Sequence, residues 1–494
     1  MTKASLEFTL SPDDLPRLLK LPFLTRAGRT ASVTTLWHDT ADGALAARAL
    51  SLSEQRGHWR LEALRPAPDR PWPPGSPAPL VAEGASPANL DPSLGGGLVP
   101  VAALQARRTE FVLRPPGPNG PASEPAPAEP VRVLVLDGRA RGITAEQPAC
   151  RVALRGEPAQ LRPAATELAG AVRLSVPRSG LAAFAAAVAR GAGPEPRHLG
   201  AAAAAPGQTT SDSAALIIGQ LLDAMLHWAA SAGAGETPVP VHQMRVATRR
   251  LRSALAVLKH VADFPEREPL SAGLRAIATR LGAARDWDVF LGDTAERAQA
   301  AFPDDGRRFR ALLAAARQRR QAAYVELRAH LAGAEFRELQ IGLACASVLR
   351  PWEREETPDP RLHEDTAAFA AAALARQVKR VRHAGRDLAA LPLPALHELR
   401  KDCKRLRYAA EFFLPLFPEK PARRFVKRLS ALQEELGTLN DGATVAGLMV
   451  HLGRAGRSHA AGLMEGFAAA GVAAARARVG QAWKRFRRAE PFWS

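Results

Sequence analysis

The stretch "VHQMRVATRRLRSALAVL" at residues 241–258 decides the fold of the second half of the chain. Its basic residues His242, Arg245, Arg249 and Arg252 are three or four positions apart, and leucines occupy the intervening positions. At about 100° per residue, the four basic side chains fall within an arc of about 80° on one helix face. The pattern therefore predicts a helix that buries its leucines in a bundle and presents a stripe of positive charge.

This stripe is repeated. The segment "LHELRKDCKRLRYAAEFF" at 396–413 has the same pattern, and "LRAIATRLGAARDWDV" at 274–289 returns as "LSALQEELGTLNDGAT" at 429–444. Both pairs are separated by 155 residues. A shared offset over such a distance predicts that residues 213–494 form an all-α domain of two copies of one helical unit that face each other.

The second repeated pair contains "LGAARDWDV" and "LGTLNDGAT". We interpret both as a turn or helix break, where Asp286 and Asp441 either cap a helix or pair with arginines of the stripes. Asp286 and Asp288 could also hold a metal ion, but two carboxylates alone are a weak signal, and a structural role is favoured.

The first 190 residues have a different pattern. Short apolar or β-branched runs such as "RVLVLDG" alternate with Pro- and Gly-rich pieces, which predicts a mostly antiparallel β domain. The Pro-rich segments 65–100 and 114–130 are expected to be long surface loops. Residues 191–212 lack apolar periodicity and are expected to link the two domains.

Composition limits the function and the compartment. The chain has 67 Lys and Arg against 49 Asp and Glu, and residues 213–494 carry +14 of the net +18, so the helical half is expected to bind a polyanion. Cys150, Cys345 and Cys403 form no CxxC pair, so neither a disulfide framework nor a thiolate metal site is expected. Glu7 interrupts any signal peptide, and we found no apolar run of about 18 residues, so we expect a cytoplasmic protein with no membrane partner.

A stripe of like charges repels itself by a few tenths of a kcal/mol per pair, and a bound polyanion would offset this repulsion. Inorganic polyphosphate would engage several basic side chains at once through charge-assisted hydrogen bonds. Pro240 and Pro394 place His242 and His397 in the first turns of their helices, where backbone N–H groups favour anions. We hypothesise that each His is near neutral in the empty protein and takes up a proton when phosphate binds. The alternative, a solvated basic face, is the commoner origin of such runs, but the repetition argues against it.

These residues resemble the CHAD domain (conserved histidine α-helical domain), whose mark is His-x-x-Arg-x-x-x-(Arg/Lys)-Arg-x-Arg in two copies. The resemblance covers about residues 213–494. It implies two four-helix bundles, related by a pseudo-twofold axis, around a basic groove that binds inorganic polyphosphate, with the protein on cytoplasmic polyphosphate granules. The binding residues that we expect on the stripes and, by the resemblance, at Lys427 are His242, Arg245, Arg249, Arg250, Arg252, His397, Arg400, Lys401, Lys404, Arg405, Arg407 and Lys427.

Residues 1–190 resemble in layout a CYTH domain, the triphosphate tunnel fold, through "LWHDTADGALAARALSLS" at 36–53 and "VRVLVLDGRARG" at 131–142. That resemblance implies an eight-stranded antiparallel barrel that hydrolyses triphosphates with Mg²⁺ or Mn²⁺. Such a tunnel needs inward-facing carboxylates for metal and basic residues for phosphate. The family's Glu-x-Glu-x-Lys is here Ser5, Glu7 and Thr9, its Arg-x-Arg is Ser51 and Ser53, and its Ser-Lys element has become "VPRSG" at 176–180. We therefore expect a degenerate, inactive relative.

The remaining acidic candidates of that domain are Glu7, Asp39, Glu62 and Asp137, which we interpret as turn or surface residues. We expect no catalytic residue, metal site or cofactor. The favoured function is polyphosphate binding. One alternative is a metal-dependent inorganic triphosphatase to which the helical domain delivers substrate. A second is a nucleic-acid binder, which is disfavoured because the chain has only 2 Tyr and the first stripe has no interleaved aromatic for base stacking. Oligomeric state cannot be deduced from these patterns.

Overall fold

The structure is a computed structural model that describes residues 3–66, 72–91, 94, 97–113, 129–142, 145–193, 197–235, 237–355 and 357–493, without the side chains of 440–443 and 473. It contains two compact units. The sheet unit comprises Met1–Gly200, Ile218–His227 and Gly333–Glu355. The helical unit comprises Ala201–Ile217, Trp228–Ala332 and Glu356–Ser494.

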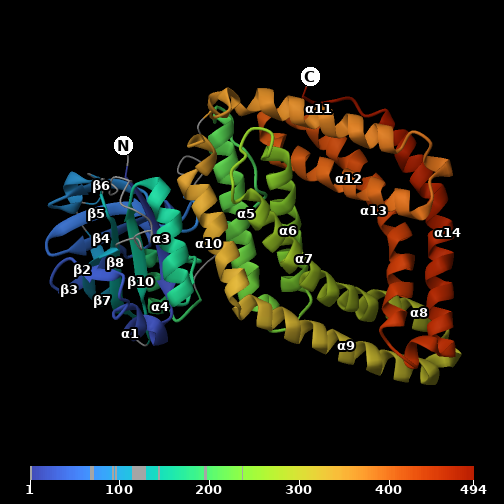
Figure 1. The fold of residues 1–494 in the computed structure, drawn as a ribbon, viewed down its shortest axis with the longest axis horizontal. Helices are drawn as coiled ribbons and strands as arrows, with labels where there is room; N and C mark the ends of the chain where they lie inside the picture. Colours follow the sequence, from blue (N-terminus) through green and yellow to red (C-terminus); the bar gives the residue numbers. More distant parts are fainter. Residues whose placement is uncertain are drawn as a thin grey trace, which may run out of the picture. The chain divides into compact units, whose positions relative to one another are not determined.

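The sheet unit contains one antiparallel sheet of eleven strands (Figure 1). The strands are β1 (Ala4–Leu10), β2 (Leu24–Arg26), β3 (Ala31–Thr40), β4 (Leu50–Gln55), β5 (His58–Ala63), β6 (Leu80–Gly84), β7 (Leu98–Leu113), β8 (Val131–Arg141), β9 (Glu146–Pro148), β10 (Arg151–Gly156) and β11 (Leu174–Ser175). Four helices accompany them, α1 (Leu15–Leu18), α2 (Ala44–Ala47), α3 (Pro158–Ala171) and α4 (Leu181–Ala189). The prediction of an antiparallel β domain is confirmed.

The sheet is tunnel-like but does not close. Its strand order is β11-β1-β10-β8-β7-β3-β4-β5-β6, with β2 on β7 and β9 on β8, and the described strands show no pairing between β11 and β6. Strand β11 has only two residues, and the rest of the outer edge of β1 is covered differently, since the Glu7 N–H donates to the Gly75 carbonyl at 2.6 Å. The closed barrel implied by the family resemblance is therefore absent from the described part of the chain.

The Pro-rich segment 65–100 is more ordered than expected. It contains strand β6, which pairs antiparallel with residues 59–62 of β5, and Trp72 is 4% exposed. The prediction of a long surface loop is therefore wrong for its described residues. The other expected loop falls almost wholly on residues 114–128, which lie outside the described residues.

Alternation along β1 separates two environments. Leu6, Phe8 and Leu10 are fully or almost fully buried, with Leu161 and Leu168 of α3 also at 0% exposure, and α3 contacts β1. Residues 5, 7 and 9 point to the opposite face of the sheet, because successive side chains of a strand alternate. That opposite face is the one on which a tunnel-type site would lie.

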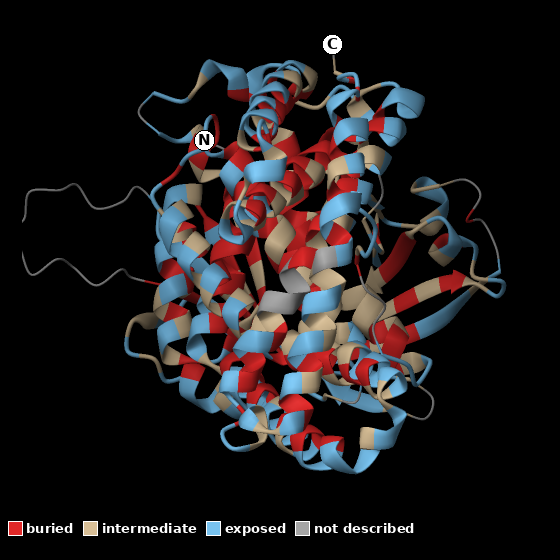
Figure 2. Cartoon of the chain, turned by 90° about the vertical axis from the view of Figure 1, so that its right-hand side faces the viewer, coloured by how far each residue is buried: buried red, intermediate tan, exposed pale blue. Residues whose placement is uncertain are grey.

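The rest of the chain is helical. The long helices are α5 (Thr210–Ala232), α6 (Val239–Leu258), α7 (Arg267–Val289), α9 (Gly306–Ala332), α10 (Ala334–Leu349), α11 (Thr366–Ala384), α12 (Leu393–Phe413), α13 (Glu419–Val450) and α14 (His459–Arg487), and a short α8 is formed by Ala295–Ala301. Helix α10 and the middle of α5 belong to the compact sheet unit. Buried residues line the inner sides of the helices, and exposed residues cover the outer sides (Figure 2).

Eight of the long helices form two sets of four in the same order. In chain order, α5, α6, α7 and α9 correspond to α11, α12, α13 and α14, and the quoted segments place 241–258 on α6 and 396–413 on α12. Contacts join α6 to α7, α12 to α13, and α6 to α12. The helical bundle predicted from the sequence is therefore confirmed, and the order of the helices is compatible with the predicted repeat.

The predicted breaks at the two "LG" segments are wrong. Residues 281–286 lie within α7 and residues 436–441 within α13, both of which continue as helices. The irregularity comes later, where Phe290–Thr294 forms a π-helical turn between α7 and α8. The side chain of Asp441, proposed as a cap, lies outside the described residues.

Within the described residues, one helix, α5, is long and apolar enough to span a membrane by length and composition, with a mean hydropathy of 1.3 over an 18-residue window. The sequence analysis did not single it out. In the structure 61% of that window is buried inside the protein, and core helices of soluble proteins pass the same test.

Candidate polyanion-binding site

The two basic stripes meet around Lys404. Burial and then the charges of Arg400, Arg249, Arg245 and Arg407 lower the pKa of Lys404 to about 7. Two of these arginines belong to α6 and two to α12, so the pairing of the helices brings both stripes to one place. We call Arg245, Arg249, Arg400, Lys404 and Arg407 the cationic cluster.

The α6 side of the cluster has little compensating charge. Burial and then Arg249 lower the pKa of Arg245; Asp286 on α7 and, more weakly, Tyr408 on α12 oppose them. The Nε atom of Arg249 is buried and has no hydrogen-bond partner among the described residues. Burying polar atoms without partners costs free energy. An incoming acceptor would therefore be stabilised here.

A glycine of the repeated "LG" motif lies beside the cluster. A Cβ atom on Gly437 of α13 would lie 3.5 Å from one guanidinium nitrogen of Arg400. The guanidinium thus lies next to the glycine on the neighbouring helix, at ordinary van der Waals distance from the position of a Cβ. This glycine lies inside a helix and beside the cluster, not in a turn.

Glu411 of α12 holds two stripe arginines. Arg250 Nη2 donates to Glu411 Oε2 at 2.7 Å, and Arg407 Nη1 lies 3.4 Å from Glu411 Oε1. The guanidinium carbons of Arg250 and Arg407 are also 5.7 and 5.1 Å from the centre of the Tyr408 ring, within cation–π range. Arg250 therefore helps to join α6 to α12 as well as contributing charge.

Asp402, on the other side of α12, also binds two arginines. It accepts from Arg405 Nη1 at 2.8 Å and from Arg380 Nε of α11 at 3.1 Å, and its side chain is 9% exposed. Lys401 forms an exposed ion pair with Glu398 at 2.7 Å. Two more of the predicted residues, Arg252 on α6 and Lys427 on α13, are exposed.

Both histidines lie near the start of their helices, as predicted. The N–H of His242 is used within the helix, where it donates to the Pro238 carbonyl at 3.1 Å. Burial and then Arg285, Arg249 and Arg245 lower its pKa. The lowered pKa of His242 thus has a different cause from the predicted one: burial first and nearby guanidinium groups second, rather than free N–H groups of the helix terminus. His397 is half-buried on α12.

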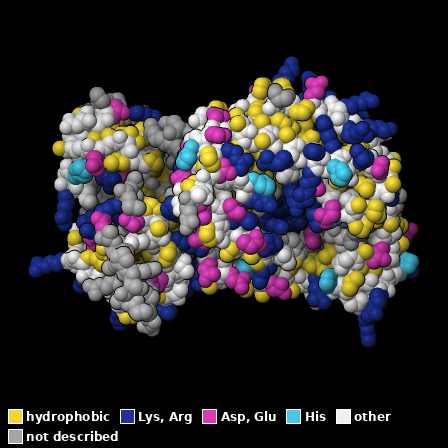
Figure 3. All heavy atoms as spheres, turned by 45° about the horizontal axis from the view of Figure 1, so that its top comes forward, with side chains coloured by type: hydrophobic (Ala, Val, Ile, Leu, Met, Phe, Trp, Pro, Cys, Tyr) yellow, Lys and Arg dark blue, Asp and Glu magenta, His cyan; other side chains and the backbone are white. Residues whose placement is uncertain are grey.

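Surface charge is concentrated over this part of the molecule. In the space-filling view, Lys and Arg side chains gather in a recess of the helical unit, with few acidic groups inside it (Figure 3). The structure therefore brings together five of the twelve predicted residues, with His242 beside them. Four of the predicted residues, Arg250, Lys401, Arg405 and, within the cluster, Arg407, form ion pairs with carboxylates.

Sequence reasoning missed these carboxylates. Asp402 precedes Arg405 by three residues, Glu398 precedes Lys401 by three, and Glu411 follows Arg407 by four. These are the spacings at which helix side chains meet. Applying the spacing rule to acidic as well as basic residues would have found them.

Asp288 is not available as a metal ligand. Its carboxylate accepts from Arg320 Nε at 2.7 Å and from the Tyr324 hydroxyl at 2.9 Å. Among the described residues, no group of three or more His, Cys, Asp or Glu side chains is arranged to hold a metal ion.

The sheet unit corrects one interpretation. Burial raises the pKa of Glu62 on β5; Arg60 opposes this, and the charge of Glu7 on β1 raises it further. Burial also raises the pKa of Glu7, with Arg151 opposing. The curled sheet thus brings two carboxyl groups to one interior, so Glu7 and Glu62 are not turn or surface residues. Asp39 also differs from the expectation, since it lies buried near the end of β3, where its carboxylate accepts from the N–H groups of Leu45 and Ala46 at the start of α2.

Residues 216–450 match the family model of the CHAD domain. A search of the curated proteins found no match. The crystal structure of the CHAD domain from the plant Ricinus communis is similar at 28% identity and a TM-score of 0.51, over 60% of this chain and 98% of that chain. The resemblance to the CHAD domain is therefore supported for residues 216–450.

Two further solved structures are similar at lower scores. PptA from Streptomyces chartreusis has 17% identity and a TM-score of 0.45, over 56% of this chain and 100% of that chain. A putative adenylyl cyclase from Hippeastrum, described as having a dominant triphosphatase activity, has 14% identity and a TM-score of 0.25, over 39% of this chain and 97% of that chain.

Proposed function

We propose that this protein binds inorganic polyphosphate through the cationic cluster and works as a binding protein on cytoplasmic polyphosphate granules. One observation carries the proposal: Lys404 is surrounded by four arginines from two helices, and burial and their charges lower its pKa to about 7. A site that disfavours its own positive charge is stabilised by a dense polyanion.

The geometry favours a chain of phosphates over a single small anion. The cluster draws on both helices, and further basic residues lie along the same faces at Arg250, Arg252 and Arg405. A linear polyanion can contact successive guanidinium groups through charge-assisted hydrogen bonds, and binding to several groups releases several counterions.

The first experiment is calorimetry of the full chain with long-chain polyphosphate. In the same preparation, phosphate release from tripolyphosphate is followed with Mg²⁺ or Mn²⁺. We expect saturable binding without release. Release would favour the triphosphatase alternative, for which Glu7 and Glu62 are the carboxylates to replace first.

Competition with a labelled oligonucleotide separates polyphosphate from nucleic acid. Polyphosphate has about one charge per phosphate and no bases, so it packs charge more densely than DNA. We expect it to displace the oligonucleotide at a lower concentration per charge. The reverse order would favour the nucleic-acid alternative.

A further inference from the structure

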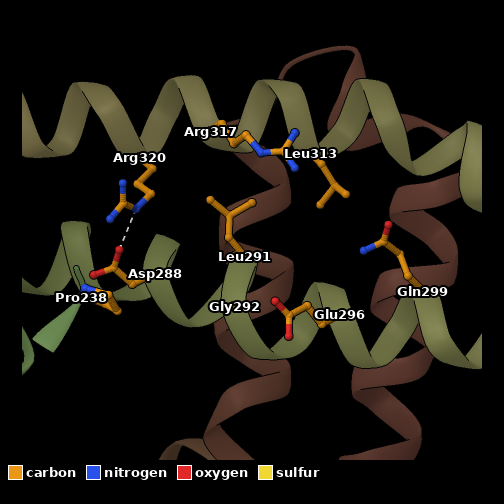
Figure 4. A pocket seen from close by; sticks show the side chains of 9 residues that line it. All are labelled: Pro238, Asp288, Leu291, Gly292, Glu296, Gln299, Leu313, Arg317 and Arg320. Carbon is orange, nitrogen blue, oxygen red and sulfur yellow. Dashed lines mark hydrogen bonds and ion pairs between the residues drawn. The ribbon is translucent and has the colours of Figure 1, made fainter. Parts of the chain in front are cut away.

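A second candidate site lies in the helical unit and includes none of the stripe residues. It is a cavity of about 410 Å³ between the end of α7, the π turn, α8 and α9 (Figure 4). Pockets of about 300 to 1,000 Å³ are typical of small-molecule sites. The size alone therefore permits a ligand of a few to a dozen heavy atoms.

The wall of this cavity has an unusual backbone. Phe290–Thr294 form the π turn, and such turns are rare and frequently occur at functional sites. Phe290 points into the core, where it is 1% exposed and meets Trp287 edge-on at 5.9 Å. Gly292 faces the open side, since no atom lies within 4 Å of the position of a Cβ there. The π turn thus keeps a space open next to a glycine.

One cation of the cavity is fixed in place. Arg320 donates through Nε to Asp288 at 2.7 Å, and its guanidinium carbon lies 4.5 Å from the centre of the Tyr324 ring. The Tyr324 hydroxyl donates to the same carboxylate at 2.9 Å, and the Asp288 side chain is 1% exposed. Asp288 is therefore neutralised within the protein, and Arg320 is held at the edge of the cavity.

The two remaining charges face each other across the cavity. Arg317 extends from α9 and Glu296 from α8, on opposite walls, with Leu291 between them (Figure 4). Within the described part of the chain, neither forms an ion pair. Both side chains are exposed and reach solvent in the empty protein, and a ligand that pairs with both carries an anionic group for Arg317 and a cationic group for Glu296. Leu291 and Leu313 offer apolar surface for the atoms between the two charges.

We propose that this cavity binds a small zwitterion of the free amino acid class. Its carboxylate lies against Arg317 and Arg320, its ammonium group against Glu296, and its carbon skeleton against Leu291 and Leu313. Opposite charges on the two walls select for a molecule that carries both charges. A simple anion such as phosphate would be repelled by Glu296.

The test is calorimetry of the full chain with each of the free amino acids. Any ligand found is then compared with its N-acetyl and amide forms, which each lack one charge. We expect at least one saturable ligand, with both singly charged forms about tenfold weaker or more, because each loses one charge-assisted contact. If no amino acid binds with a Kd below about 10 mM, or if one charge suffices, the proposal is wrong.

Replacing Glu296 distinguishes a zwitterion site from an anion site. Glu296→Gln should weaken binding of the amino acid about tenfold or more. For an anion site the same change would strengthen binding, because it removes a repulsive charge, and inorganic phosphate would then bind the cavity. That outcome would overturn the proposal.

A matched pair of glycine variants locates the ligand. Gly292→Leu places a side chain in the cavity and should abolish binding, whereas Gly466→Leu on α14 enters equally open space elsewhere and should have no effect. Equal effects, or none, would place the ligand outside the cavity. Circular dichroism confirms that both variants are folded. The double variant Arg249→Gln with Lys404→Gln should leave amino acid binding unchanged, which keeps this test separate from polyphosphate binding.

Discussion

Helices α6 and α12 present the same stripe with different neighbours. Residues 239–258 of α6 contain no acidic residue, whereas α12 contains Glu398, Asp402 and Glu411. Glu411 binds Arg250 of α6 as well as Arg407 of its own helix. One repeat therefore supplies all the carboxylates within the two stripes.

The stripe positions also divide by function. Arg250 and Arg405 are equivalent in the repeat, and each is held by a carboxylate of α12. Arg249 and Lys404 are likewise equivalent, but no described residue forms an ion pair with either. The first pair of positions mainly joins helices, and the second pair is the centre of the proposed binding site. Identical spacing in a sequence does not imply identical roles, because each side chain's partners come from other turns and helices.

The largest expected effect comes from the central pair. Replacing Arg249 and Lys404 together by Gln should weaken polyphosphate binding by about 10²-fold, since two charge-assisted contacts of about 1.5 kcal/mol each are lost. Calorimetry at several salt concentrations measures both the loss and the reduced salt dependence.

The control neutralises the same number of charges on the same two helices. Arg250→Gln with Arg405→Gln should weaken binding less than tenfold, because these arginines are already engaged by carboxylates. Equal losses in both double variants would mean that total charge, rather than the cluster, determines binding. Charge reversal at Arg405 is avoided, since a new carboxylate beside Asp402 would perturb the fold.

The next effect is on pH dependence. With the pKa of Lys404 at about 7 in the empty protein, its ammonium group is charged below pH 7 and binding is insensitive to its titration there. A bound polyanion raises this pKa, so above pH 7 binding takes up a proton and affinity falls by up to about tenfold per pH unit. Calorimetry in buffers of different ionisation enthalpy measures the uptake.

Lys404→Arg keeps the charge but does not titrate in this range, so it should remove the slope above pH 7. His242 adds uptake at lower pH, because its pKa is lowered from 6.5 and polyphosphate raises it again. Affinity that is flat from pH 5.5 to 8 would refute the histidine hypothesis. A slope that persists in Lys404→Arg would assign the proton to another group.

A smaller effect comes from Glu411. Glu411→Gln removes both partly buried ion pairs that join the stripes, and it should lower the free energy of unfolding by about 1 to 2 kcal/mol. It should also raise polyphosphate affinity a few-fold, since Arg250 and Arg407 become available. Urea unfolding and calorimetry measure the two changes. Glu398→Gln, which breaks only an exposed pair, is the control and should change stability by less than about 0.5 kcal/mol. Loss of affinity in Glu411→Gln would show that the carboxylate orders the site.

The smallest expected effect is at Lys401. Its ion pair with Glu398 is exposed, and salt screens such charges strongly. Lys401→Gln should change polyphosphate affinity less than about threefold. A tenfold loss would place Lys401 in the binding site and extend the cluster along α12.

Much of the fold could be predicted because the spacing of apolar and basic residues along the chain indicates where helices form. The spacing of leucines and arginines identified α6 and α12, and the 155-residue offset identified the repeat. The "LG" segments were misinterpreted as breaks because glycine is the usual signal for a helix end. Gly437 instead lies inside a helix beside Arg400 of a neighbouring helix, a contact that local sequence does not show.

The residues of the candidate site were proposed one by one from the sequence, but their pKa values could not be predicted from it. A basic stripe on one helix can be recognised from spacing, yet the lowered pKa of Lys404 depends on arginines from a second helix. In the sheet unit, Glu7 and Glu62 were assigned to turns or the surface because they are 55 residues apart and the motif around Glu7 has lost its other charged residues. Curling of the sheet brings them near each other.

By itself, the sequence determined the helical periodicity, the repeat, the positions of the stripes and the excess of positive charge, because these depend only on residue type and spacing along the chain. Tertiary structure alone decided which cations converge, which are neutralised by Glu411 and Asp402, and where Arg317 and Glu296 face each other. Electrostatic free energy depends on distance and burial, and both are set by residues brought together from distant parts of the chain.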